Sequence, residues 1–329
     1  MFEGYVQIAI FVVVLVALVK PVGIYLARVF NNERVFLTPV LGPIERGTYR
    51  LLRVNPEGEG QDWKAYARSL VVFSLLFWLL LYLILRTQGI QPFNPEGFKS
   101  GPWDLSFNTT SSFLTNTNWQ YYGGETTLSY FAQMAGLAVQ NFVSAAVGIA
   151  VLVALIRGIV SRSGKSLGNF WQDVTRILLY VLLPMSIVAA LFLVSQGVIQ
   201  NLSHATLIHT LSGGTQVLAQ GPVASQEAIK ELGNNGGGFF NVNSAYPFEN
   251  SSGLTNFFEM LLMLIIPAAL TYTYGRMVGS QRQGWAIFSA MFVLFVIGVV
   301  VVYIAEQHGT AAQHAAGVHT TAVHGSTGG

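Results

Sequence analysis

The chain has 329 residues, of which 52% are hydrophobic and only 10% are charged, against about 25% charged in typical soluble domains. This composition excludes an ordinary soluble enzyme, and the formal net charge of +2 gives no sign of a nucleic-acid partner. Because the chain has no cysteine, disulfides and thiolate metal sites are excluded as well.

Six apolar stretches approach or exceed the roughly 20 residues that a helix needs to cross a bilayer. The first is not typical of a cleavable signal, because Glu3 replaces a basic start and the apolar run continues past Lys20 to Val29. The sequence therefore predicts an all-α, multi-pass integral membrane protein. The six predicted spans are 5–29, 69–88, 129–157, 174–196, 257–278 and 284–305.

The basic residues predict the orientation of these spans. Thirteen of the 17 lysines and arginines lie at or between span ends on one side, in the loops that follow the first, third and fifth spans. Only Arg86, Lys99 and Lys230 lie on the other side, and Lys20 lies within the first span. By the positive-inside rule, both termini face outward, and so do the two long loops at 89–128 and 197–256.

The two outward loops contain an internal repeat. FLTNTNW at 113–119 aligns with ELGNNGG at 231–237, and LSYFAQM at 128–134 aligns with LTNFFEM at 254–260. Each loop also carries a short amphipathic segment before its tip, at 106–114 and 223–232, and each lies between two spans. The sequence therefore predicts one unit that occurs twice: a span, a short pore helix with a tip rich in Asn, Gly and Thr, and a second span.

Such tips suit a cation pathway, because backbone carbonyls can replace the hydration shell of a potassium ion. Non-helical backbone at membrane depth is tolerated where it is buried in protein or lines a watery cavity. Asp104, Glu125 and Glu249 lie in the same outer loops, where acidic groups would raise the local cation concentration. The alternative is that the tips are two structured extracellular turns.

One face of the third span is polar. Gln133, Gln140, Asn141 and Ser144 share a helical face, which should turn away from lipid. This face either lines a pore or supplies hydrogen bonds between helices. We see no motif for covalent chemistry: no nucleophile elbow and no paired catalytic carboxylates. His204 and His209 are expected at the surface.

Four segments resemble the KdpA family, the potassium-binding subunits of the Kdp potassium-transporting ATPase. They are TNTNWQ (115–120), GETTLSYF (124–131), GPVASQEAIKELGNNGGGFFNVNSAYPFEN (221–250) and LTNFFEM (254–260). The resemblance implies a fold of the potassium-transporter superfamily, built from span–pore-helix–span repeats, with about six transmembrane helices and two re-entrant pore helices here. It further implies a selectivity filter whose ions are held by backbone carbonyls. The implied potassium-binding residues are Thr115, Asn116, Thr117 and Asn118 in one repeat, and Gly233, Asn234, Asn235 and Gly236 in the next.

Further expectations follow from the resemblance. Gln120, just behind the first tip, is a weaker candidate for lining the pore, together with Gln133, Gln140 and Asn141. The chain would bind and translocate potassium as its substrate and would need no cofactor of its own. ATP and magnesium would act at a P-type ATPase partner, KdpB, and the complex would also contain KdpC and a small single-span protein. The expected location is the inner (plasma) membrane of a bacterium or archaeon.

The predicted organisation departs from the family in one respect, because the family has four filter segments and this sequence has two. The first part, 1–65, holds a span and a basic loop; 66–160 and 161–280 are the two repeats; 281–307 opens a third repeat; and 308–329 is a low-complexity outer tail. We therefore expect a fragment, a truncated product, or a chain complemented by another half, with dimerisation as a further alternative. A stand-alone channel, a secondary transporter and a non-conducting remnant stay open as other functions.

Overall fold

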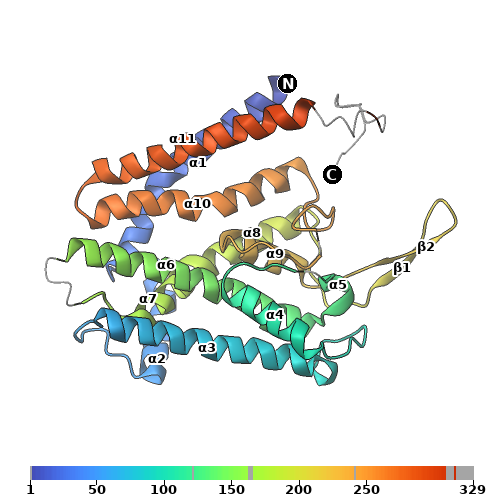
Figure 1. Ribbon diagram of the computed structural model, residues 1–329, viewed down its shortest axis with the longest axis horizontal. Coiled ribbons are helices and arrows are strands. Elements are labelled where there is room, and N and C mark those ends of the chain that lie inside the picture. The colour runs from blue at the N-terminus through green and yellow to red at the C-terminus, as the bar shows by residue number, and fades with distance from the viewer. Residues whose placement is uncertain (1, 121, 162–165, 241, 309–314, 316–329) are drawn as a thin grey trace.

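The computed structural model describes residues 2–120, 122–161, 166–240, 242–308 and 315, and these are mostly helical (Figure 1). Six helical segments within them are long and apolar enough to cross a membrane. This confirms the six predicted spans, with ends that differ by one to six residues. The predicted tail at 308–329 lies outside the described residues, apart from His308 and Ala315. The spans are Glu3–Phe30, Trp63–Ile90, Ala132–Val160, Phe170–Ser195, Gly253–Met277 and Gln281–Glu306.

Several spans consist of more than one helical element. The first, second, fifth and sixth spans correspond to α1 (Phe2–Phe30), α3 (Trp63–Thr87) with the short 3-10 turn η1 (Gln88–Ile90), α10 (Gly253–Met277) and α11 (Gln281–His308). The third begins with the π-helical turn η2 (Ala132–Ala138) and continues as α6 (Val139–Val160). The fourth comprises α7 (Phe170–Arg176), the π-helical turn η3 (Ile177–Leu182) and α8 (Leu183–Ser195). The remaining helices are α2 (Thr38–Leu52), α4 (Trp103–Leu114), α5 (Gly124–Thr127) and α9 (Val223–Leu232).

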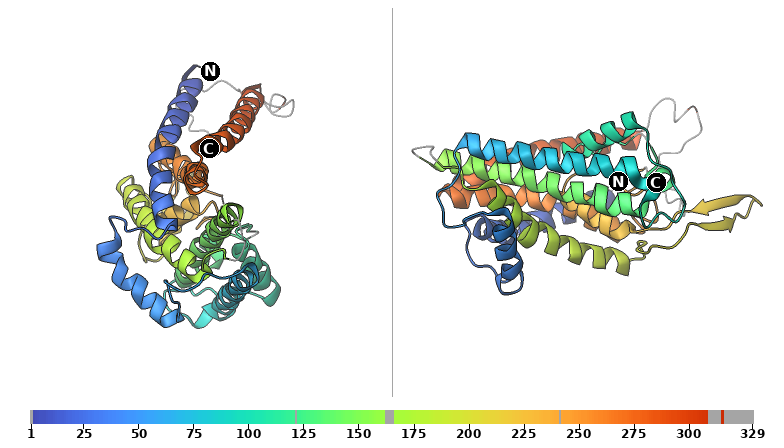
Figure 2. Two further views of the ribbon diagram at one scale, coloured as in Figure 1. Left: turned by 90° about the vertical axis from the view of Figure 1, so that its left-hand side faces the viewer. Right: turned by 90° about the horizontal axis from the view of Figure 1, so that it is seen from below.

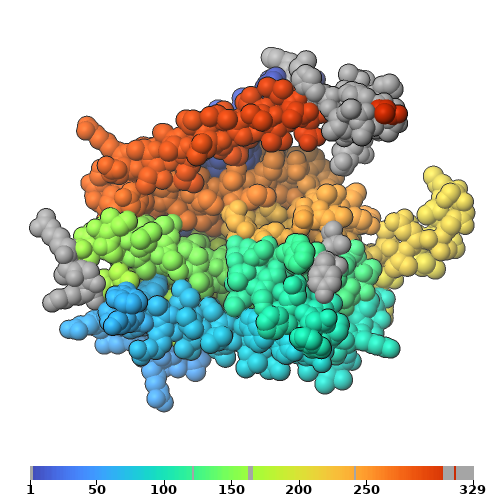
Figure 3. All heavy atoms as spheres, viewed as in Figure 1, coloured from blue at the N-terminus to red at the C-terminus, as the bar shows by residue number. Residues whose placement is uncertain are grey.

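The spans lie roughly side by side, and the loops gather at the two ends of the bundle (Figure 2). Helix α2 lies at one end. At the other end, strands β1 (Thr206–His209) and β2 (Thr215–Leu218) form an antiparallel hairpin that projects from the body of the molecule (Figure 3). No pattern in the sequence predicted this hairpin, whose eight residues are mostly exposed.

The two short helices α4 and α9 do not span. They have 12 and 10 residues, which at 1.5 Å per residue gives about 18 and 15 Å, roughly half the thickness of a hydrocarbon core. They occupy the places predicted for the pore helices at 106–114 and 223–232, and α4 begins three residues earlier than expected. Each helix follows a proline, Pro102 or Pro222. Helix α6 packs against both of them.

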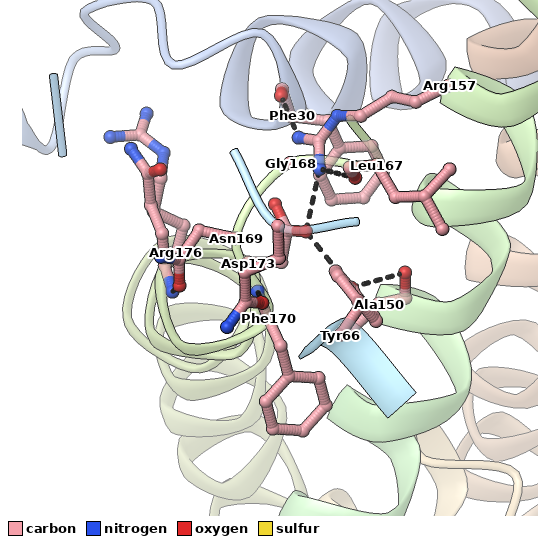
Figure 4. A network of polar contacts seen from close by, with 12 residues as sticks. Phe30, Tyr66, Ala150, Arg157, Leu167, Gly168, Asn169, Phe170, Asp173 and Arg176 are labelled. Atoms are coloured by element: carbon pink, nitrogen blue, oxygen red, sulfur yellow. Dashed lines mark hydrogen bonds and ion pairs between the residues drawn. The ribbon is translucent and has the colours of Figure 1, made fainter. Parts of the chain in front are cut away.

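A buried network joins four helices near the end of the bundle that carries α2 (Figure 4). The Asp173 carboxylate of α7 accepts hydrogen bonds from Arg157 of α6 (2.6 Å) and from the Tyr66 hydroxyl of α3 (3.0 Å). The same arginine donates to the carbonyl of Phe30 at the end of α1 (2.9 Å). A cation at a helix C-terminus is favourable, because the last carbonyls carry partial negative charge.

A second buried ion pair attaches α2 to the bundle. Arg176 lies 2.7 Å from the Glu45 carboxylate and donates to the carbonyl of Val29 (2.9 Å). Tyr49 and Tyr180 donate to the same carboxylate at 2.8 and 2.6 Å. Burial alone would raise the pKa of Glu45, but the hydrogen bonds from both tyrosines and the charge of Arg176 outweigh it, so the pKa lies below its usual value. Glu45 is therefore ionised at neutral pH.

Candidate ion-binding site

The first short helix ends in a Schellman motif. Asn116 adopts a left-handed conformation, with φ of 60°. Its backbone N–H donates to the carbonyl of Phe113 (3.3 Å), and the N–H of Thr117 reaches back to the carbonyl of Ser112 (3.0 Å). These two bonds satisfy carbonyls that the end of a helix would otherwise leave unpaired. They also turn the chain sharply away from the axis of α4.

The second short helix ends in the same way, 118 residues later. Asn234 has φ of 52°, its N–H donates to Glu231 (3.2 Å), and the N–H of Asn235 donates to Lys230 (3.1 Å). Asparagine suits both positions, because it tolerates the left-handed region better than most residues with a β-carbon. The predicted alignment of the two tips therefore corresponds to equivalent backbone geometry.

A second left-handed residue follows in each tip. Asn118 has φ of 52° and the equivalent Gly236 has φ of 79°. Among the described residues, the carbonyl oxygens of 115–118, and those of Asn235 and Gly236, accept no hydrogen bond. Carbonyls without a partner can act as ligands for a cation. Of the predicted site residues, Thr115, Thr117, Asn234 and Gly236 are exposed, whereas Asn118, Gly233 and Asn235 are buried.

The two tips are in direct contact through the side chain of Asn116. Its amide nitrogen donates to the carbonyl of Asn234 (3.2 Å) and lies 3.4 Å from that of Gly233. Its amide oxygen accepts from the Ser144 hydroxyl of α6 (2.8 Å) and from the side chain of Asn235. Asn116 was predicted only as a backbone ligand. The structure gives its side chain a second role, which is to join the two tips and α6.

Gln120 links the two chain segments that follow the tips. Its side-chain oxygen accepts a hydrogen bond from the backbone N–H of Gly238 (3.2 Å). The backbones approach closely here, because a β-carbon on Gly237 would lie 3.0 Å from both the Asn118 carbonyl and the Gln120 side chain. With φ of 69°, Gly237 is suited to this position for conformational reasons as well.

The polar face of the third span turns inward, as predicted. Gln133, Gln140, Asn141 and Ser144 are all buried. Gln140 donates to the carbonyl of Phe77 in α3 (2.7 Å), and Gln133 accepts from Gln226 in α9 (3.0 Å). These contacts are hydrogen bonds between helices. Asn141 lies behind the second tip, where its carbonyl is 3.0 Å from the position of a β-carbon on Gly233.

A buried charge cluster behind the second tip was not predicted. Lys230, on α9, is almost fully buried and lies 3.1 Å from Glu227 and 3.6 Å from Glu231. Burial alone would lower the pKa of Lys230, but the carboxylates of Glu227, Glu249 and Glu231 outweigh it and hold the pKa above its usual value. Burial also raises the pKa of Glu227 to about 8 and that of Glu249 above its usual value, so the cluster combines the Lys230 ammonium with carboxyl groups that are not all ionised at neutral pH.

Glu249 does not lie exposed in an outer loop, as its sequence position predicted. It was expected to attract cations in an outer loop, yet it is fully buried and accepts a hydrogen bond from the backbone N–H of Phe240 (3.1 Å). Its apparent place in a polar loop gave no sign of this burial. A cavity of about 730 Å³ opens beside the cluster and reaches the second tip, with Gly236, Lys230, Glu231 and Glu259 in its lining.

The arrangement of six candidate spans around two short helices with equivalent tips defines a multi-pass helical membrane protein. Residues 9–327 match the family described as the potassium-transporting ATPase A subunit. The chain belongs to this family. It is 56% identical over 316 residues to the potassium-transporting ATPase potassium-binding subunit of Brucella anthropi. The aligned region covers 96% of this chain and 56% of the relative.

Two further relatives carry the same description. The protein from Granulibacter bethesdensis is 55% identical over 315 residues, covering 96% of this chain and 55% of the relative. The protein from Methylorubrum extorquens is 57% identical over 304 residues, covering 92% of this chain and 53% of the relative. The chain thus spans about half the length of the curated relatives it matches.

Proposed function

We propose that this chain contributes to the potassium-binding and translocating subunit of an ATP-driven potassium uptake complex. The ion would be selected by backbone carbonyls at the two tips: Thr115 to Asn118 and Gly233 to Gly236. The observation that carries the proposal is the recurrence, 118 residues apart, of a pore helix closed by the same hydrogen bonds and followed by a second left-handed residue. The closing hydrogen bonds also end other helices of this chain, such as α2 and α10. The second left-handed residue and the contact between the tips through Asn116 are what set these two turns apart.

The chemistry of the tips supports a monovalent cation as the substrate. Carbonyl oxygens are neutral ligands that replace hydrating water without fixing a large negative charge. Among the described residues, no group of three or more His, Asp or Glu side chains is arranged to hold a metal ion, so the tips, rather than a carboxylate cage, are the candidate ligands. The hydrogen bonds of Asn116 and Gln120 between the tips hold them against each other. This limits how far they can adapt to ions of another size.

The energy for uptake would come from a partner. The names of the relatives describe one subunit of a potassium-transporting ATPase, which supports assembly with the P-type ATPase KdpB, the partner that would bind ATP and magnesium. KdpC and a small single-span protein would complete the complex. The complex would lie in the inner membrane of a bacterium or archaeon. Both termini and both tips would face outward, which the distribution of basic residues supports.

The test is the ATPase activity of the purified complex that contains this chain. Potassium is expected to stimulate ATP hydrolysis at much lower concentration than sodium. A complex with Gly237→Ala should lose this stimulation, because the new β-carbon would meet the Asn118 carbonyl and the Gln120 side chain. Equal stimulation by both ions in the unaltered complex would contradict the proposed function.

A further inference from the structure

One residue on each pore helix holds its tip at both ends. In the first repeat this residue is Ser112. Its backbone carbonyl accepts from the N–H of Thr117 (3.0 Å), and its hydroxyl donates to the carbonyl of Trp119, just beyond the tip (3.1 Å). One peptide group within the ion-binding segment and one just after it are therefore both attached to the same turn of α4.

Lys230 is the equivalent residue of the second repeat, 118 positions later, and it makes the equivalent contacts. Its carbonyl accepts from the N–H of Asn235 (3.1 Å), and its ammonium donates to the carbonyl of Gly237 (2.7 Å). Trp119 and Gly237 are themselves equivalent positions. The same clamp is thus made by a neutral hydroxyl in one repeat and by a charged ammonium in the other.

Carboxyl groups of neighbouring residues lie next to the charge of Lys230. Its ammonium lies close to Glu227 and Glu231 and also donates to the Ser244 hydroxyl (2.6 Å). A buried ammonium without such partners would be costly and would repel a cation held by the neighbouring carbonyls. Because the carboxyl groups of Glu227 and Glu231 lie beside it, they offset part of its charge, and the lysine can fix the Gly237 carbonyl with less repulsion of a nearby cation.

We propose that Ser112 and Lys230 are positioning residues that set the ion selectivity of the two tips. By occupying the carbonyls of Trp119 and Gly237, they fix the peptide planes that end each tip and leave the carbonyls before them available to the ion. This inference rests on the proposed function, and it assigns the clamping of the filter to two side chains that do not touch the ion. Loss of a clamp lets the tip adapt to ions of a different size.

The experiment uses Ser112→Ala in the purified complex that contains this chain. We measure ATPase stimulation by potassium and by rubidium, and take the half-saturating concentration and the maximal rate for each ion. A neutral hydrogen bond of this kind corresponds to about a fivefold change in an equilibrium. We expect the half-saturating potassium concentration to rise by about fivefold and the ratio between the two ions to shift. The maximal rate should change by less than about twofold. Ser112→Thr, which keeps the hydroxyl, should restore both values.

Ser111→Ala is the matched control. Ser111 is the adjacent residue of α4, and its hydroxyl accepts from the indole of Trp78 (3.2 Å) rather than holding the tip. This variant should leave the potassium-to-rubidium ratio unchanged. For the second repeat, Lys230→Met is combined with Glu227→Gln, so that no charge of that pair is left without its partner. A charge-assisted bond predicts a larger shift than Ser112→Ala.

The outcomes separate this inference from the proposed function. If the unaltered complex shows no potassium stimulation, the proposed function is contradicted and this inference with it. If the unaltered complex is stimulated but Ser112→Ala leaves both half-saturating concentrations unchanged, the clamp has no role in selectivity and the inference alone is overturned. An equal fall of both maximal rates, with the ratio unchanged, also overturns it, because that result indicates a purely structural role. The Ser112 variants change no charge and decide the matter even if the Lys230 variant does not assemble.

Discussion

Replacing Gly236 by alanine tests the conformation of the second tip separately from its packing. Gly236 has φ of 79°, and a β-carbon there would have no heavy atom within 4 Å. The substitution therefore introduces no collision, and its cost is that of holding an L-residue in the left-handed region, about 1–2 kcal/mol. If the tip relaxes to relieve this strain, potassium binding weakens by about 5- to 30-fold.

The assay is the half-saturating potassium concentration for ATP hydrolysis by the complex, measured beside those for rubidium and sodium. Gly236→Asn is the informative comparison, because Asn118 already holds a left-handed conformation at the equivalent position of the first tip, so this variant should lose less than Gly236→Ala. Gly47→Ala in α2 adds a β-carbon that also meets nothing within 4 Å, far from the tips, and should behave as the unaltered protein does. Unchanged potassium selectivity in Gly236→Ala would remove Gly236 from the site and refute the reasoning.

Three further predictions concern orientation, stability and the contact between the tips. With no native cysteine, Gly58→Cys should be protected from an impermeant thiol reagent on intact cells, whereas Leu211→Cys on the hairpin should be modified; the reverse pattern would overturn the orientation. Glu45→Gln should destabilise the protein by about 3–5 kcal/mol in thermal or denaturant unfolding, because it leaves a buried arginine unpaired. Glu33→Gln should have little effect, because its ion pair is exposed and 4.0 Å long. Since the folded-state pKa of Glu45 is lowered, its contribution to the free energy of unfolding is present above about pH 4.5 and is lost as the pH falls through the folded-state pKa. A free energy of unfolding that does not decrease over this pH range would contradict the pairing. Asn116→Gly removes the side-chain contacts to the second tip and to Ser144 of α6. Asn116→Ala removes the same contacts and adds backbone strain, so alanine should impair potassium affinity more. Equal effects would show that the φ of 60° is not a constraint.

The sequence predicted the spans and the repeat, because both depend on local patterns. Uninterrupted apolar runs located all six spans to within a few residues. The alignment of FLTNTNW with ELGNNGG located tips whose hydrogen bonds are equivalent. The asparagines at the tips, predicted from the sequence as backbone ligands, also have a conformational role, since Asn116 and Asn234 terminate their helices in the left-handed region.

The contacts that complete the site could not be predicted in this way, because they join residues far apart in the chain. Asn116 and Asn234 are 118 positions apart, and nothing in the local sequence predicts that the side chain of one donates to the backbone of the other. Lys230 was counted among the few basic residues of the outer side, and a lysine on an amphipathic segment is expected at the surface. Its burial depends on carboxylates supplied by α9 and by the loop that contains Glu249. Ser112 aligns with Lys230, but a hydroxyl and an ammonium have only a hydrogen-bond donor in common. The alignment therefore did not predict that the two side chains make equivalent contacts.

The most direct test of the account is the location of a bound ion in the complex that contains this chain. Crystals or grids prepared with rubidium or thallous ion in place of potassium would show its position, by anomalous scattering or by density. The account predicts an ion in direct contact with carbonyl oxygens of both tips, from 115–118 and from 233–236. An ion found only in the cavity beside Lys230 and Glu231, or at a site that neither tip touches, would contradict it.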